Sequence, residues 1–130
     1  MARVLLLAHC GLARALRRTV MEIVGSCPQV AALDLSADQA PEVFLERVRA
    51  LIMEDRGHPP ILILTDIYGG TPWRIAGILA QDDGMAGRIA ILTGVNLAMV
   101  LEACTLDSSN ITLETLTEQV RLAAINGICV

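Results

Sequence analysis

Apolar residues follow two different patterns along this chain. Four short segments are almost continuously apolar and have the length of a strand; they are residues 3–8, 30–33, 61–64 and 88–92. Between them, apolar residues recur every three or four positions, as they do on one face of a helix. Strands that are apolar throughout and alternate with helices are typical of a parallel sheet covered on both faces. The pattern therefore predicts an α/β fold.

The segments between the apolar runs also carry helix start signals. We expect helices at about 12–25, 41–52, 71–80, 96–104 and 113–124. Thr71 is suited to the N-cap of the third helix, because Pro72 then occupies its first turn. Thr115 and Glu118 have the spacing of a capping box. The last residues, 127–130, are apolar again and resemble a strand.

The length and hydropathy of the chain indicate one domain over residues 1–130. Although 54% of the residues are hydrophobic, Arg, Asp, Gly or Pro interrupts every apolar run before it reaches the roughly 18 to 20 residues of a membrane-spanning helix. The first residues contain no cleavage-site pattern. We therefore expect a cytoplasmic protein with a single core.

The charged residues exclude several kinds of chemistry. The formal net charge is −4, and all ten basic residues are arginine. Without lysine there can be no Schiff base, no Walker A phosphate loop and no receiver-type phosphoaspartate site. The acidic balance and the three aromatic residues argue against nucleic acid as a partner.

The four cysteines provide no recognisable site. They are widely separated along the chain, at positions 10, 27, 104 and 129. Neither a zinc site nor a dithiol redox motif has this spacing. We expect buried, reduced thiols, no metal and no cofactor.

Polar residues follow two of the predicted strands at their carboxyl ends, where ligands gather in α/β sheets. His9 ends the first strand and Asp66 the third. A carboxylate within reach of one imidazole nitrogen fixes the tautomer and leaves the other nitrogen as a nucleophile. Alternatively, His9 is a hydrogen-bonded structural residue and Asp66 caps the following turn.

The turn after Asp66 has the composition of an anion site. Gly69 and Gly70 permit positive φ angles and close approach, and Thr71 begins a helix whose N–H groups and hydroxyl are available. Trp73 is expected to pack beside this cradle. The alternative is a tight strand-to-helix turn that binds nothing.

Two other interpretations of the first strand end are weaker. His9-Cys10 is reminiscent of the cysteine phosphatases, but their arginine would fall at Leu16, and Arg17 is about 100° away around the helix. A metal site made of His9, Cys10 and Asp66 lacks a recognised ligand spacing.

Three arginines follow His9 at helical spacing, and we expect them on one face of the first helix. They are Arg14, Arg17 and Arg18. Such a face is usually only solvated, but beside a phosphoryl site it could also attract an acidic partner.

In their order along the chain, His9, Asp66, the Gly-Gly-Thr-Pro turn and the later segment 93–97 (Thr-Gly-Val-Asn-Leu) resemble the phosphotransferase-system IIA domain of the mannose family. The resemblance covers essentially all 130 residues. It implies that His9 is phosphorylated, that Asp66 orients it, and that Thr71 with the backbone around Gly69 and Gly70 binds the phosphoryl oxygens. The family generally has glycine directly after the histidine, whereas this chain has Cys10.

The resemblance also implies a fold and partners. The fold is a three-layer αβα sandwich with a mostly parallel sheet of order 2-1-3-4 and a C-terminal strand, antiparallel and exchanged within a homodimer. The histidine phosphocarrier protein would be the donor and a IIB component the acceptor, so that a membrane permease is reached only through IIB. The sugar is not identified by these residues.

Two further functions share the same residues. One is the phosphoryl-donor subunit of dihydroxyacetone kinase, whose turn is typically less like Gly-Gly-Thr-Pro. The other is a regulatory module that is phosphorylated on His9 only to change its partners. The chemistry at His9 would be identical in all three.

Overall fold

The four apolar runs form one sheet. The computed structural model describes residues 1–130, and its strands are β1 (Arg3–His9), β2 (Val30–Leu35), β3 (Ile61–Thr65) and β4 (Ile89–Leu92). The strand order is β2-β1-β3-β4, and each neighbouring pair is parallel. The predicted fold class and strand order are confirmed.

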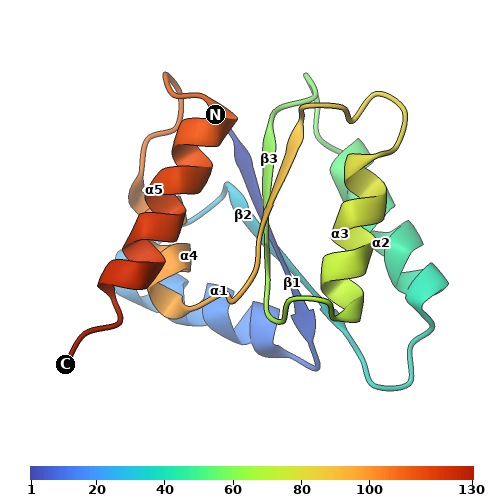
Figure 1. Cartoon of the computed structure of the whole chain (residues 1–130), viewed down its shortest axis with the longest axis horizontal. Helices are drawn as coiled ribbons and strands as arrows, with labels where there is room; N and C mark the ends of the chain where they lie inside the picture. Colours follow the sequence, from blue (N-terminus) through green and yellow to red (C-terminus); the bar gives the residue numbers. More distant parts are fainter.

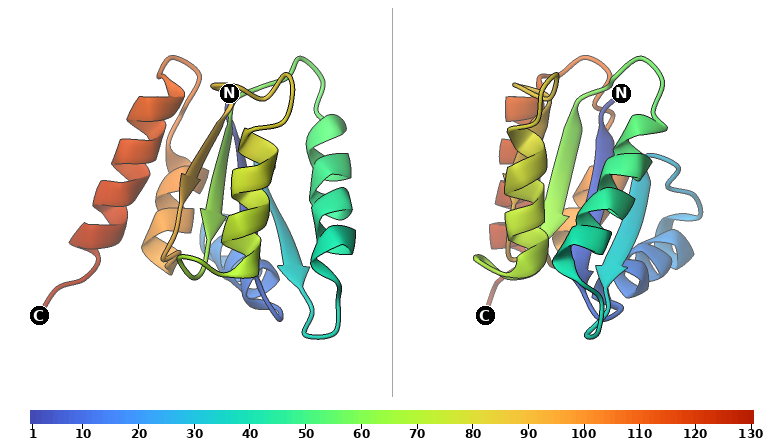
Figure 2. Two further views of the ribbon diagram at one scale, coloured as in Figure 1. Left: turned by 45° about the vertical axis from the view of Figure 1, so that its right-hand side comes forward. Right: turned by 90° about the vertical axis from the view of Figure 1, so that its right-hand side faces the viewer.

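Helices cover both faces of this sheet (Figures 1 and 2). One layer contains α1 (Leu12–Val24), α4 (Leu97–Thr105) and α5 (Leu113–Asn126), and the other contains α2 (Pro41–Met53) and α3 (Thr71–Ala80). None of these helices is both long enough and apolar enough to cross a membrane.

The alternation of side chains along the strands divides the core into two parts. Leu6 and Ala8 of β1 face α1, α4 and α5, whereas Leu5 and Leu7 face α2 and α3. Because successive side chains of a strand point to opposite faces, a strand covered on both sides must be apolar at every position. The continuous apolar runs in the sequence have this cause.

Two of the predicted helix caps are wrong. The α3 helix already includes Thr71, and its N-cap is Gly70, whose backbone is extended. In α5 the N-cap is Thr112, whose side chain accepts a hydrogen bond from the N–H of Thr115 at 3.0 Å. The α3 helix thus begins at Thr71 itself, and α5 begins two residues before Thr115.

The first turn of α1 is capped by a residue far away in the sequence. Its N-cap, Gly11, has no side chain to offer. The carboxylate of Asp34, near the end of β2, accepts hydrogen bonds from the N–H groups of Ala13 and Arg14 at 2.8 and 3.1 Å. Asp34 thus provides both the acceptor and the negative charge that stabilise a helix N-terminus.

The cysteines differ from our expectation of four buried, reduced thiols. Cys27 and Cys104 are paired as a disulfide, with Cα atoms 5.6 Å apart, between the loop before β2 and the end of α4. Cys10 and Cys129 are free but exposed. The pairing depends on the packing of two segments 77 residues apart, which sequence spacing does not reveal.

The C-terminal residues, 127–130, form no strand in this chain. They continue from α5 away from the body of the molecule (Figure 1), and Ile128 and Val130 are exposed. The chain's own sheet therefore has only four strands. The exchange of a C-terminal strand with a second copy stays a prediction.

Candidate functional site

The two predicted site residues at strand ends are in direct contact. The strands β1 and β3 are neighbours in parallel register, with Leu7 opposite Thr65, so their carboxyl ends lie together. The Nδ1 atom of His9 is 2.8 Å from Oδ2 of Asp66. Sheet topology thus joins two residues that are 57 positions apart in the chain.

The carboxylate of Asp66 is held from both sides. Oδ2 also accepts the backbone N–H of His9, and Oδ1 accepts that of Ile67, each at 2.9 Å. Burial alone would raise the pKa of Asp66, but the hydrogen bonds from the His9 backbone and ring, with the contribution of Ile67, outweigh it and lower that pKa from its ordinary value. Asp66 is therefore ionised at neutral pH.

The position of Asp66 decides which nitrogen of His9 is free. An ionised carboxylate can only accept, so Nδ1 carries a proton, and in the neutral ring Nε2 keeps its lone pair. The His9 side chain is 37% exposed, whereas that of Asp66 is 8% exposed. The ring is thus anchored on its inner side and accessible on its outer side.

Gly70 packs against the free side of this ring. A Cβ atom at position 70 would lie 3.1 Å from Cε1 of His9 and 3.7 Å from Nε2. Gly69 precedes it in the left-handed conformation, at φ 81°, and the N–H of Gly70 donates to the carbonyl of Ile67. The two glycines therefore build a closed turn that permits close approach to the ring.

The N-terminus of α3 follows directly. The N–H groups of Thr71 and Trp73 in its first turn have no acceptor within the chain, and Pro72 between them has no N–H. Such groups, together with the helix dipole, favour an anion. Of the predicted phosphoryl-binding residues, Gly70 has its N–H engaged by the carbonyl of Ile67, whereas the N–H groups of Gly69 and Thr71 are available, and Trp73 adds a third.

Cys10 has an unusual backbone conformation. Its φ angle is 65°, in the left-handed region that favours glycine. This explains why a glycine suits the position after the histidine. The nearby Arg17 does not reach the site, since its Nε donates to the carbonyl of Val30 at 2.7 Å. This contact disfavours the phosphatase interpretation further.

An apolar rim beside the histidine was not recognised in the sequence. Ile67 and Tyr68 are 60% and 73% exposed, and the rings of Tyr68 and Trp73 pack at an interplanar angle of 52° with their centroids 4.7 Å apart. Two apolar residues in a tight turn between Asp66 and the glycines are the signal that could have indicated it. The chain contains no group of three or more His, Cys, Asp and Glu residues that could hold a metal ion.

Several solved structures have a fold similar to that of this chain. The chain matches the phosphotransferase system component EIIA from Streptococcus agalactiae with a TM-score of 0.89 and 22% identity, covering 100% of this chain and 97% of that one. It matches the mannose/sorbose specific IIA subunit from Enterococcus faecalis with a TM-score of 0.87 and 23% identity, covering 99% and 93%.

A third structure has the same fold in another setting. It is a sigma-54 interaction domain protein from Enterococcus faecalis, with a TM-score of 0.81 and 22% identity, covering 97% of this chain and 92% of that one. At these identities the matches establish the fold alone. No curated protein matches the sequence.

The sequence itself matches one family model, EIIA-man, described as the PTS system fructose IIA component, over residues 3–121. The match includes both strand ends that carry the candidate site and nearly all of the sheet and its helices. The chain therefore belongs to the EIIA-man family of phosphotransferase-system IIA components.

Proposed function

We propose that this chain carries a phosphoryl group on Nε2 of His9. The donor is the histidine phosphocarrier protein and the acceptor is a IIB component, which passes the group on for the uptake and phosphorylation of a sugar. The observation that carries the proposal is the 2.8 Å contact of Nδ1 with Asp66, which leaves Nε2 free beside Gly70.

The transfer requires only one bond to form and one to break. The Nε2 lone pair of His9 attacks the phosphorus of the donor phosphohistidine, and the P–N bond of the donor breaks with its electron pair returning to the donor imidazole. The Nδ1 proton of His9 stays against Asp66, which stabilises the positive charge that develops on the ring. In the second transfer a nucleophile of IIB attacks the phosphorus, and the P–Nε2 bond breaks with its electron pair returning to the imidazole of His9.

The residues around His9 would contribute position and charge. Phosphoryl transfer needs in-line geometry and donors for the equatorial oxygens more than covalent help from the protein. Thr71 would donate its N–H and hydroxyl, and Trp73 its N–H. Gly70 would let the phosphoryl group approach the start of α3, and Gly69 would hold the turn in shape.

The exposed apolar rim supports a protein as donor and acceptor. Ile67 and Tyr68 stand beside a histidine that is itself accessible. Aromatic residues are enriched at protein interfaces, and partners that exchange a phosphoryl group must bring two imidazoles together. The rim would dock each partner in turn over Nε2.

The proposal is tested by intact mass after incubation with phosphoenolpyruvate, the general phosphotransfer enzyme and the histidine phosphocarrier protein. We expect one acid-labile phosphoryl increment, absent in His9→Ala. The chain offers a matched control, because it has only one other histidine, His58, and His58→Ala should retain the increment. A folded protein without any increment, or one that keeps it in His9→Ala, would refute the proposal.

A second step separates transport from regulation. Addition of a purified IIB component should remove the increment from the phosphorylated chain, since IIB is the proposed acceptor. A phosphorylated chain that transfers to no IIB component would instead support the regulatory role, in which the phosphate on His9 changes partners.

We also propose that two copies exchange their C-terminal residues, 127–130. Ile128 and Val130 are exposed and lie outside the chain's own sheet. Pairing with the sheet of a second copy would bury them. Light scattering after gel filtration should give a dimer for the full chain and a monomer after deletion of 127–130; a monomeric full chain would contradict the exchange.

A further inference from the structure

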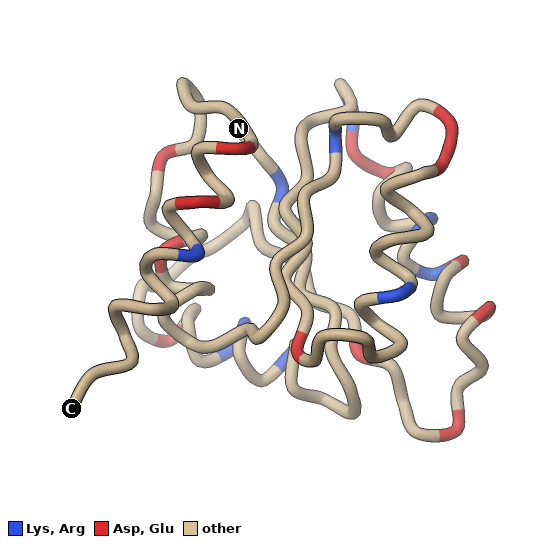
Figure 3. The backbone as a smooth tube through the Cα atoms, viewed as in Figure 1, with Lys and Arg blue, Asp and Glu red and all other residues tan.

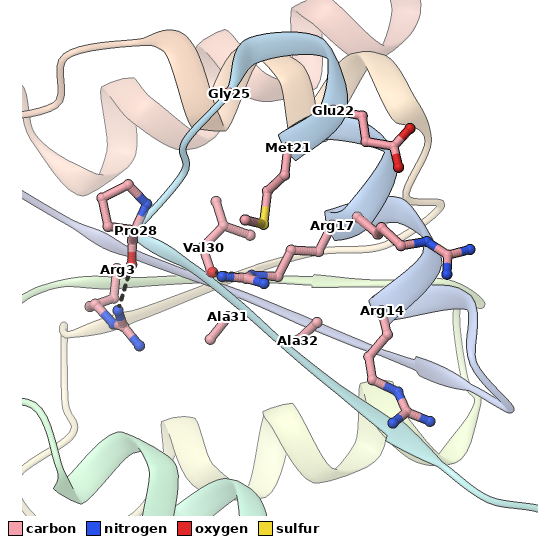
Figure 4. A pocket seen from close by; sticks show the side chains of 11 residues that line it. Arg3, Arg14, Arg17, Met21, Glu22, Gly25, Pro28, Val30, Ala31 and Ala32 are labelled. Atoms are coloured by element: carbon pink, nitrogen blue, oxygen red, sulfur yellow. Dashed lines mark hydrogen bonds between the residues drawn. The ribbon is translucent and has the colours of Figure 1, made fainter.

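A second concave region lies away from the candidate site, between α1 and the outer edge of β2 (Figure 4). Its volume is about 820 Å³, within the range of roughly 300 to 1,000 Å³ that is typical of small-molecule sites. Four of its lining residues are arginines: Arg3, Arg14, Arg17 and Arg18. The only acidic side chain in the lining is Glu22.

The four arginines differ in how their charge is compensated. Arg3 pairs with Asp55 at 3.0 Å, and Arg14 contacts Asp34 at 3.4 Å. The side chains of Arg17 and Arg18 have no carboxylate within salt-bridge distance, and the guanidinium of Arg18 makes no hydrogen bond within the chain.

The uncompensated charge is concentrated in a protein that is acidic overall. The net charge of the chain is −4, yet the basic positions of α1 lie close together along the helix (Figure 3). A concave surface on which one charge sign predominates focuses the electric field on its interior. The planar guanidinium group matches phosphate oxygens with two parallel hydrogen bonds. Two such groups without a carboxylate partner suit a dianion.

The floor of the hollow is small and apolar. Ala31 and Ala32 border it along the edge of β2, with their small side chains on opposite faces of the sheet, and Val30 and Met21 complete the apolar lining. The N–H of Val4 donates to the carbonyl of Gln29, which therefore faces β1. Because successive residues of a strand turn their backbone groups to opposite sides, the N–H and carbonyl of Ala32 face outward from the edge of the sheet. The hollow therefore has room for the uncharged part of a ligand next to the arginines, and the outward backbone groups of β2 could orient it.

The edge itself is not free for another strand. Adding a strand to β2 would require the outward carbonyl of Val30, but Arg17 already donates to it at 2.7 Å. In Figure 4 the Arg17 side chain extends across the hollow to Val30, and Arg3 closes the opposite end beside Pro28. This arrangement disfavours an extended peptide and favours a compact ligand.

We propose that the hollow between α1 and β2 binds a small phosphate ester, whose dianionic phosphate pairs with Arg17 and Arg18 and whose body lies over Ala31 and Ala32. This site is separate from His9 and does not depend on the proposed phosphocarrier function.

The test uses inorganic phosphate and adenosine monophosphate as probes, followed by two-dimensional NMR of the backbone amides and the arginine Nε–H groups. We expect saturable shifts at Arg17, Ala31 and Ala32, with tighter binding of adenosine monophosphate because it adds a body to the phosphate. In Arg17→Gln/Arg18→Gln the affinity should fall at least about tenfold, since charge-assisted hydrogen bonds are lost.

The matched control is Arg47→Gln/Arg56→Gln, which removes the same charge elsewhere and should leave the affinity unchanged. If Arg17→Gln disturbs folding through its contact with Val30, Arg18→Glu provides a second variant, because the side chain of Arg18 is exposed and makes no hydrogen bond or ion pair that the fold would lose. This reversal should also weaken binding at least about tenfold.

Three outcomes would overturn the proposal. One is no saturable shift with either probe. A second such outcome is that the NMR shifts are confined to Thr71 and Trp73, which would place the bound anions only at the candidate site. The third is binding of an acidic Glu-Val peptide at Ala31 and Ala32 without binding of either phosphate probe, which would assign the hollow to a protein partner.

Discussion

The candidate site and the arginine-lined hollow both suit phosphate, but they offer it different groups. At the carboxyl ends of the strands, His9 supplies a nucleophile and α3 supplies N–H groups, and no arginine bonds to His9 or Asp66. Along the edge of β2 there are four arginines and no nucleophile. A carrier must release what it accepts, and strong ion pairs to the bound group would stabilise it against onward transfer.

The comparison predicts that the two regions can be disabled independently, which is the largest effect we expect. His9→Ala should abolish phosphorylation completely and leave the affinity for adenosine monophosphate unchanged. Arg17→Gln/Arg18→Gln should weaken the binding of adenosine monophosphate and leave the phosphorylation of His9 unchanged. Both proteins are assayed by intact mass and by NMR titration. Loss of both properties in either variant would mean that the regions form one site.

Asp66→Asn should slow phosphorylation of His9 by about 10- to 100-fold, because an amide can donate to Nδ1 and stabilise the wrong tautomer. Rapid-quench measurement of phosphoryl transfer gives the rate. The matched control is Asp34→Asn, which alters another carboxylate that accepts two backbone N–H groups. It should lower stability and leave the rate unchanged; equal slowing in both variants would deny Asp66 a specific role.

Gly70→Ala should slow the transfer about tenfold, since a Cβ atom 3.1 Å from Cε1 forces the ring of His9 to shift. Gly77→Ala is the control on the same helix, with no heavy atom within 4 Å of the added Cβ. It should leave the rate unchanged and raise the melting temperature, because alanine favours helix over glycine. An unchanged rate in Gly70→Ala would argue against close packing at Nε2.

Cys10→Gly should stabilise the fold by about 0.5 to 1 kcal/mol, because glycine adopts a φ of 65° without strain but loses more chain entropy on folding. Urea unfolding measures the change. Cys10→Ala is the control that removes the thiol and retains the strain, so it should gain nothing. Equal stabilisation in both variants would assign the effect to the sulfur.

The smallest effect that we expect is on the stability of the protein at acid pH. The lowered pKa of Asp66 means that its contribution to stability is complete above its unfolded-state pKa of about 3.9 and is lost as the pH falls through the lower folded-state value. Wild-type protein should therefore lose stability more steeply than Asp66→Asn between about pH 5 and about pH 2. Urea unfolding across this range tests it, and parallel curves would contradict the pKa difference.

Much of the fold could be predicted because the burial of a strand on both faces requires a continuous apolar run in its sequence. A strand covered on both sides has to be apolar at each position, so 61–64 indicated a central strand without any knowledge of its neighbours. His9 and Asp66 were recognisable for a similar reason, since polar residues directly after such runs must lie at the rim of the sheet.

Helix caps and cysteine partners were predicted less well. The backbone conformation of Gly70, and not the side chain of Thr71, determines where α3 begins. Cys27 and Cys104 come together only because α4 packs beside the segment that leads into β2. Neither the path of the backbone nor this packing has a signature at the residues concerned.

The sequence by itself determined the order of strands and helices, the all-arginine basic set and the residues that end each strand, because these depend on local composition and periodicity. Only the tertiary structure decided which residues meet. The parallel pairing of β1 with β3 brings Asp66 to Nδ1 of His9, and the outer position of β2 gathers Arg3 with the arginines of α1. Both contacts join residues distant in the chain, and sheet packing alone sets such distances.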